Sequence, residues 1–179
     1  MATISGGDKL GAALRKIASN VSKASSVSVG FLEGSTEPDG TSIPMIAAIQ
    51  EFGAPGVGIP PRPFFRTMIA KHSSEWPDAI KENLKTNNYD GLRTLNQIGS
   101  VIAGELQQSI VDTNDPALSP VTVMLRGMRK QKRYRDLPFG ELITEARARV
   151  EAGKTSYGAS TKPLVDSGSM LNSVDYDVK

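Results

Sequence analysis

The sequence predicts a single domain of the α+β class, in which several helices cover a small antiparallel or mixed sheet. Three observations predict this class. Apolar residues recur at helical spacing in several stretches, and short stretches near the two ends of the chain alternate between apolar and polar residues. The length of 179 residues suffices for one hydrophobic core. We therefore expect one domain over residues 1–179, with the two terminal strands paired.

The N-terminal part predicts a helix followed by a strand. Leu10, Leu14, Ile17 and Val21 form one apolar stripe, and Asp8 can cap a helix over residues 8–23. Apolar residues then alternate with polar ones, which predicts a half-buried strand over 27–33. Residues 34–41 are rich in Gly, Ser, Pro and Asp, and we expect a loop there.

The next segment predicts short helices separated by a stiff loop. Residues 43–52 suit a helix, with Pro44 in its first turn and Gly53 in the closing position. Residues 53–63 carry so many Pro and Gly that we expect no regular element. A helix over 64–72 follows, and Trp76-Pro77 predicts a break before a further helical stretch over 79–85.

The strongest helical pattern lies in the middle of the chain. Asp90 is a candidate cap for a helix over 90–112, in which Gly99 and Gly104 can mark close packing against a neighbour. Its apolar stripe consists of Leu92, Leu95, Ile98, Ile102, Leu106 and Ile110. We expect a loop over 112–120, helices over 121–133 and 138–152, and a second loop over 153–161. Alternation in the last residues predicts a strand over 173–178.

Composition excludes several classes of protein. The chain has no Cys, which excludes disulfides, thiolate zinc sites and a Cys nucleophile. No apolar run approaches the ~18 residues that cross a bilayer. The N-terminus lacks the basic start and apolar stretch of a signal peptide. We expect a soluble protein that is not secreted and does not bind membranes.

Charge is concentrated in one segment, although the formal net charge of the chain is only +2. Residues 121–150 hold eight Lys or Arg and three acids, a net charge of +5. The cations that form candidate DNA-facing positions are Arg126, Arg129, Lys130, Lys132, Arg133 and Arg135. Two interpretations remain open. The stretch contacts phosphates, with Tyr134 available for stacking, or it is a solvated arm that docks on an acidic neighbour.

The sequence gives no pattern typical of an enzyme. The only histidine, His72, has no partner at a metal-ligand spacing, and we expect it at the surface or at a helix end. No stretch matches a phosphate-binding glycine loop. Ser167-Gly168-Ser169 lacks the spacing of a nucleophile elbow. We therefore expect no catalytic residues, no metal and no cofactor.

Two separated motifs instead indicate a protein that takes part in an assembly. The first is Glu51-Phe52-Gly53 followed by Ile59-Pro60-Pro61-Arg62-Pro63-Phe64-Phe65-Arg66. The second runs from Pro163 to Val174 and reads PLVDSGSMLNSV. Aromatic and Arg side chains commonly anchor interfaces. We expect one of the two adjacent Phe residues to lie in the core and the other at an interface.

These motifs resemble those of the tail completion or neck proteins of tailed bacteriophages. The first is similar to the family's "EFG…IPARPFFR" pattern. Residues 118–122 and 163–174 resemble its later "P-L-S-x-x-T" and "P-L-x-D-T-G-x-L-x-x-S-I" patterns. Ser167 stands where Thr is commoner in the family. In many relatives the gap between the two later patterns is short, whereas residues 123–162 separate them here. The segment 121–160 therefore resembles a basic insertion, which either faces the DNA channel or reaches a neighbouring subunit.

The resemblance implies a structural protein of the virion, made in the host cytoplasm and located in the neck at the head–tail junction. Such proteins typically form a ring, often of six subunits, around the DNA path. The implied partners are further copies of the chain, the head connector or stopper, and the tail terminator and tail tube proteins, with non-specific contact to packaged DNA. The implied structural or interface positions are Phe52, Gly53, Pro61, Arg62, Pro63, Phe64, Phe65, Arg66, Leu164, Asp166, Gly168 and Leu171.

Two alternatives remain. The same motifs fit a tail terminator or a minor capsid or tail protein, which position in the virion would distinguish. The basic stretch fits a nucleic-acid-binding module, whose affinity would fall steeply with salt.

Overall fold

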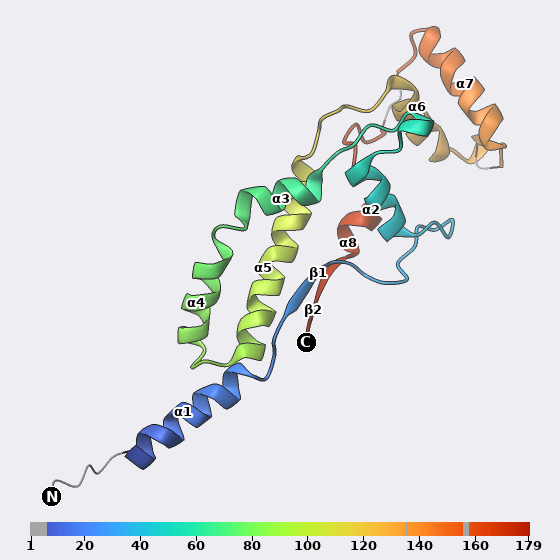
Figure 1. Ribbon diagram of the computed structural model, residues 1–179. Helices are drawn as coiled ribbons and strands as arrows, with labels where there is room; N and C mark the ends of the chain where they lie inside the picture. Colours follow the sequence, from blue (N-terminus) through green and yellow to red (C-terminus); the bar gives the residue numbers. More distant parts are fainter. Residues whose placement is uncertain (1–6, 135, 156–157) are drawn as a thin grey trace, which may run out of the picture.

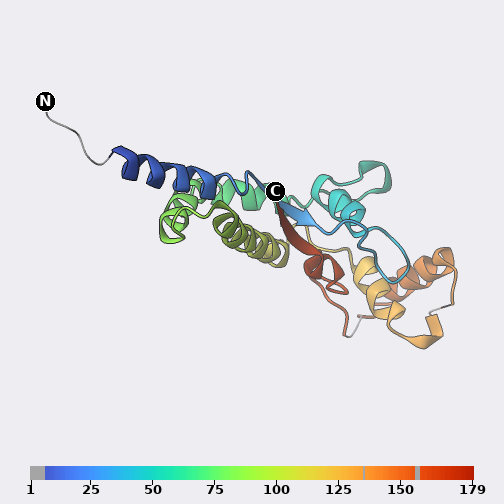
Figure 2. The ribbon, with the colours of Figure 1, turned by 90° about the horizontal axis from the view of Figure 1, so that it is seen from below.

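A computed structural model describes residues 7–134, 136–155 and 158–179 (Figure 1). Within this part of the chain, helices predominate and a two-stranded antiparallel sheet lies near the middle of an elongated molecule (Figures 1 and 2). The α+β prediction is confirmed. None of the described helices is both long and apolar enough to cross a membrane.

The N-terminal helix α1 (Gly7–Val21) ends two residues before the predicted boundary and leads into strand β1 (Val27–Phe31). None of the residues of α1 is buried, and the helix extends away from the body of the molecule (Figure 1). Its C-terminal end meets the start of the central helix, where a Cβ on Gly91 would lie 2.5 Å from the carbonyl oxygen of Val21. A small residue is therefore required at this contact.

The two terminal strands pair as predicted. Strand β1 runs antiparallel to β2 (Val174–Val178), and Val29 lies opposite Tyr176. Because side chains alternate along a strand, one face of this sheet carries the apolar residues, and this face packs on the central helix. Ser28, Gly30, Asp175 and Asp177 lie on the opposite face.

Helix α5 (Gly91–Asp112) is the centre of the main core. Asp90 caps it as predicted, because its carboxylate accepts a 3.0 Å hydrogen bond from the backbone N–H of Arg93. Most of the predicted stripe is buried or half-buried, with Leu106 and Ile110 completely enclosed, but Leu92 is 45% exposed. The prediction of close packing is confirmed at Gly99, where an added Cβ would lie 2.5 Å from Tyr176. It is wrong for Gly104, which faces open space.

Three helices lie between β1 and α5: α2 (Ile43–Phe52), α3 (Phe64–His72) and α4 (Trp76–Thr86). The loop 53–63 differs from the prediction, because Pro55–Val57 form a 3₁₀ turn and Ala54 forms a β-bridge with Ile59. The predicted break between two helices is present but lies at residues 73–75, and Trp76-Pro77 begin α4, since proline suits the first turn of a helix.

The basic segment forms a second, smaller core. Helices α6 (Pro120–Arg129) and α7 (Phe139–Glu151) pack around buried side chains, with a 3₁₀ turn at Lys132–Tyr134 between them. The members of this core are Met124, Met128, Tyr134, Leu142 and Ala146. The helix predicted over 121–133 ends earlier, at Arg129, and its last part is the 3₁₀ turn.

The second motif contains a short helix that the sequence did not indicate, α8 (Ser169–Asn172). Gly168 precedes it with a φ of 84°, which favours glycine at this position. The hydroxyl of Ser167 accepts a hydrogen bond from the backbone N–H of Ser169. Both serine hydroxyls also donate 3.0 Å hydrogen bonds to the carboxylate of Glu37, which connects this motif to the loop after β1.

Candidate functional site

The first motif forms a rigid junction between the end of α2 and the start of α3, and we call residues 50–53 and 61–66 the α2–α3 junction. Glu51 is its central residue and is only 5% exposed. Its carboxylate accepts hydrogen bonds from the backbone N–H groups of Phe65 at 2.8 Å and Arg66 at 3.2 Å. Helix α3 has no side-chain cap at Pro63. Glu51 therefore supplies, from another helix, the acceptors that the first turn of α3 lacks.

Arg62 ties the junction to two other segments. Its Nε donates to the carbonyl of Pro116 at 2.9 Å, and its Nη1 donates to Oε1 of Gln50 at 3.0 Å. Arg62 is 4% exposed. Burial, assisted by the positive charge of Arg126, lowers the pKa of the Arg62 guanidinium. The Arg62 side chain thus has a structural role, because it connects these segments inside the fold.

The two adjacent aromatic residues take different positions. Phe64 is 1% exposed and packs edge-to-face on Phe31 with ring centroids 6.1 Å apart. Phe65 is half-buried. The predicted core Phe is therefore Phe64, and the interface role of the other stays a prediction. The interface role predicted for Arg62 and Phe64 does not fit this structure, because their own chain encloses both side chains.

The outward side of the junction is apolar. Phe52 is 67% exposed, and the Arg66 guanidinium lies 5.2 Å from the centre of its ring. Beside them is an open hollow of about 240 Å³, whose floor includes Phe31, Phe64 and Phe65. Gly53 turns the chain here with a φ of 75°, and a Cβ would lie 2.8 Å from the nitrogen of Pro61. The tight turn keeps Phe52 at the rim of the hollow.

The second motif is held by Arg126 of α6. The guanidinium donates hydrogen bonds to the carbonyls of Lys162 at 2.6 Å and Pro163 at 2.8 Å, and Nε lies 3.3 Å from the carboxylate of Asp166. Burial lowers the pKa of Arg126, and Asp166 partly offsets this. Because its side chain is only 13% exposed, Arg126 does not fit the predicted DNA-facing position.

Of the remaining predicted site residues, Asp166 has a 43% exposed side chain and Leu171 packs partly against the main core. Gly168 is explained by its backbone conformation. These positions shape the second motif, and a role in an interface stays a prediction for them.

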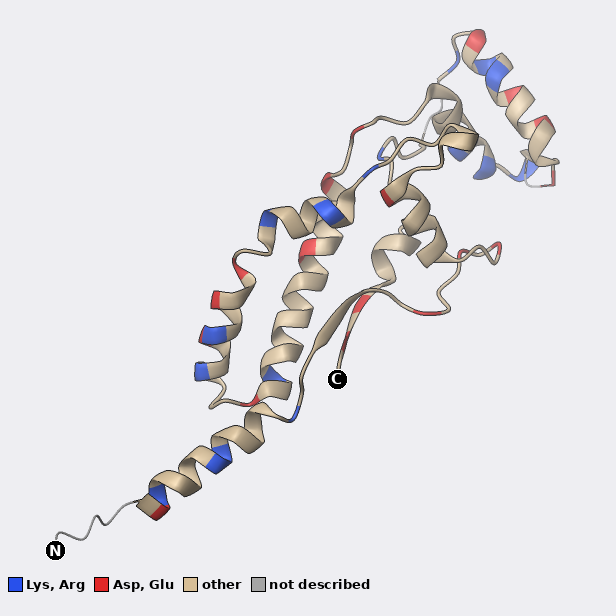
Figure 3. Ribbon diagram, in the orientation of Figure 1, with Lys and Arg blue, Asp and Glu red and all other residues tan. Residues whose placement is uncertain are grey.

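The other predicted cations differ from Arg126 because they are exposed. Arg129, Lys130, Lys132 and Arg133 lie at and beyond the end of α6 (Figure 3). Arg129 lies over Phe139 and Arg133 over Tyr134, at 5.6 and 4.5 Å from the ring centres. Arg135 lies outside the described residues. Tyr134 is buried, so its ring is not available to stack on a base.

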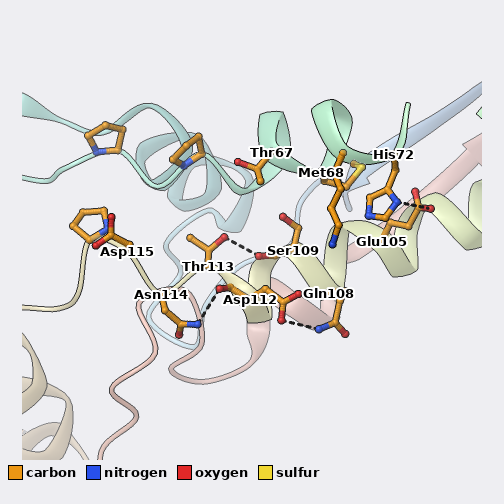
Figure 4. A pocket seen from close by; sticks show the side chains of 14 residues that line it. Thr67, Met68, His72, Glu105, Gln108, Ser109, Asp112, Thr113, Asn114 and Asp115 are labelled. Carbon is orange, nitrogen blue, oxygen red and sulfur yellow. Dashed lines mark hydrogen bonds and ion pairs between the residues drawn. The ribbon is translucent and has the colours of Figure 1, made fainter. Parts of the chain in front are cut away.

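Another hollow lies between α3, the end of α5 and the loop 112–116 (Figure 4). It has a volume of about 440 Å³ and carries charges of both signs, including Lys71 and Asp112. His72 lies at the end of α3 as predicted, with Nδ1 3.6 Å from a carboxylate oxygen of Glu105. That carboxylate also accepts a 2.9 Å hydrogen bond from Trp76. These contacts join α3 and α4 to α5.

No protein-family model, curated protein or solved structure matches this chain. Among the described residues, no group of three or more His, Asp or Glu side chains is placed to hold a metal ion. In the same part of the chain every buried polar side-chain atom has a hydrogen-bond partner. The motif residues that the structure brings together therefore form a scaffold whose buried polar side-chain atoms are all hydrogen-bonded, with an apolar outer side.

Proposed function

We propose that this chain is a structural protein of a tailed phage, a tail completion or neck protein that joins the tail to the head connector. One observation carries the proposal. The motif residues build a rigid junction whose polar groups are paired internally, while Phe52 and the neighbouring apolar hollow face outward. A rigid support with an exposed aromatic anchor is suited to binding another protein.

The distribution of apolar surface supports an assembly subunit. Large apolar side chains are exposed together at two places: Leu10, Leu14 and Val21 on one side of α1, and Phe52 beside the apolar hollow of the α2–α3 junction. Single exposed apolar residues are common, but gathered ones mark interaction sites. In the proposed particle, neighbouring subunits cover these apolar surfaces.

The proposed assembly is a ring of this chain, often six copies in the family that it resembles, around the path of the DNA. Head-to-tail contacts between different surfaces close into a ring when the rotation permits. The proposed partners are the head connector or stopper on one side and the tail terminator and tube proteins on the other. The exposed cations after α6 are candidates for non-specific contact with DNA.

The proposal is tested by replacing Phe52 in a phage that carries this gene. Phe52→Ala removes the exposed ring and leaves the buried residues of the junction in place. We expect a folded monomer together with full heads beside separate tails in electron micrographs. The matched control is Val101→Ala, which trims a 55% exposed side chain on α5 and should leave joined particles. Joined, infectious particles with Phe52→Ala would remove the proposed role of this surface.

A nucleic-acid-binding module is the second candidate, favoured by the four exposed cations Arg129, Lys130, Lys132 and Arg133. A tail terminator or minor capsid protein is a neighbouring role. Labelling of the protein in intact particles separates the neck from these other positions.

A further inference from the structure

Helix α1 presents an apolar face that no residue in the described ranges 7–134, 136–155 and 158–179 covers. Leu10, Leu14 and Val21 are 63%, 57% and 38% exposed. Their spacing of four and seven residues places them on one side of the helix. Within the part of the chain that the structure describes, α1 is fixed at its C-terminal end, by the close contact at Gly91 and an ion pair of 3.6 Å between Lys23 and Asp90. The rest of the helix extends beyond the body (Figure 1).

The outer face of the β1–β2 sheet is the second incomplete surface. Helix α5 covers the opposite face, and no described element is packed over the outer one in Figures 1 and 2. This face holds a shallow hollow of about 260 Å³, with Leu32 at 47% exposure on its border. Ser28 and Gly30 are small, and a Cβ on Gly30 would meet nothing within 4 Å. Small residues allow another helix to approach the strands closely.

The two surfaces have complementary charge. Helix α1 carries Lys9, Arg15 and Lys16 against one acid, Asp8. The hollow on the sheet is lined by three acids, Glu33, Asp175 and Asp177. Of these, Asp177 lies 3.5 Å from Lys179, and both side chains are largely exposed. A cationic helix with an apolar stripe therefore matches an acidic face with a small, partly apolar hollow.

We propose that the apolar face of α1 from one copy of this chain packs on the outer face of the β1–β2 sheet of the next copy. The contact joins two different surfaces, so it is head-to-tail and can close into a ring. The inference rests on the proposed function, because it names the surfaces through which the ring subunits meet.

A second copy fits better than a fold-back of α1 onto its own sheet. The segment between α1 and β1 is anchored, since the N–H groups of Ser25 and Ser26 donate to the carbonyl of Lys179 at 2.6 and 3.0 Å. Together with the Gly91 contact, this holds α1 pointing away from its own strands. The helix is thus directed toward a neighbour.

Disulfide trapping tests the inference cleanly because the chain has no Cys. Leu14→Cys and Gly30→Cys are made in separate chains that carry tags of different size. The two chains are oxidised together in two settings. In the first they are mixed as purified proteins, and in the second they are produced in the same cells and oxidised in the particles that form. We expect a disulfide-linked dimer that contains both tags. The control replaces Gly30→Cys by Gly104→Cys, which also faces open space but lies on α5, and should give no such dimer.

Charge reversal provides a second test. Lys9→Glu with Lys16→Glu should abolish the cross-link, and adding Asp175→Lys with Asp177→Lys on the partner chain should restore it. Absence of the Leu14–Gly30 product in both settings overturns the docking. The docking is also overturned if Leu14→Cys and Gly30→Cys, placed in the same chain, form a disulfide only within that chain and never between two chains. If the wild-type chain still self-associates and joins particles, the docking alone is wrong. If it does neither, the proposed function fails.

Discussion

The role of Glu51 gives the most direct test of how the α2–α3 junction is stabilised. Glu51→Ala removes the acceptor of two backbone N–H groups at the start of α3 and of the Nε of Arg66, which lies 2.7 Å away. Loss of a helix cap costs about 1 kcal/mol, and an unsatisfied buried donor costs about 1–3 kcal/mol. We therefore expect the free energy of unfolding to fall by about 2–4 kcal/mol.

Two further variants separate the cap from the ion pair. Glu51→Gln keeps one carbonyl acceptor and should cost about half as much. Arg66→Ala leaves the Glu51 carboxylate bonded to the two backbone N–H groups. It removes the ion pair, the Nη2 hydrogen bond to the Glu51 carbonyl and the contact with the Phe52 ring. The Arg66 side chain is 58% exposed, and exposed pairs contribute about 0–1 kcal/mol. The order of stability should be Arg66→Ala above Glu51→Gln, and Glu51→Gln above Glu51→Ala.

Urea unfolding followed by tryptophan fluorescence is a suitable assay. The single Trp, Trp76, packs against the main core and is bonded to Glu105. With a urea dependence of about 2 kcal/mol per M, the midpoint of Glu51→Ala should fall by about 1–2 M. An unchanged midpoint, or an equal loss in Arg66→Ala, would show that Glu51 does not act as the cap of α3.

Three further predictions concern packing, pH and nucleic acid. Gly99→Ala should lower the free energy of unfolding by about 1–2 kcal/mol, because the new methyl group collides with Tyr176 and Val27. The matched change Gly104→Ala, in open space on the same helix, should raise it by about 1 kcal/mol; equal effects in urea unfolding would contradict the close contact at Gly99. The hydrogen bond from the N–H of Arg93 lowers the pKa of the Asp90 carboxyl. Its stabilising effect is present above the ordinary pKa of an aspartate and is lost as the pH falls through the lowered pKa. Asp90→Ala should therefore lower the urea midpoint at pH 7, and the difference from wild type should vanish in acid; a constant difference would exclude this origin. Neutralising Arg129, Lys130, Lys132 and Arg133 together should weaken DNA binding and flatten its dependence on salt in a fluorescence titration, whereas unchanged affinity would exclude this stretch as a DNA contact.

Elements with a strong local pattern could be predicted from the sequence. The periodic stripe and the cap at Asp90 predicted α5, and strict alternation predicted both strands. The pairing of the two strands could be predicted as well, because the sequence indicates no third strand with which either could pair. The short helix α8 was missed, since it has four residues and too few positions to show a period.

The site was harder to predict because its contacts join residues that are distant in sequence. The pattern of the first motif marked Glu51, but nothing in it indicated that the carboxylate caps α3. Likewise Arg126 belongs to a stretch of exposed cations, and only the fold reveals that it is bonded to the carbonyls of the second motif. Charge density alone does not distinguish a structural arginine from a free one.

Electron microscopy of a phage from which the gene has been deleted tests most directly the proposal that this chain joins heads to tails. We expect full heads beside separate tails, with joined virions restored when the gene is supplied in trans. Normal joined virions without the gene would contradict the proposal.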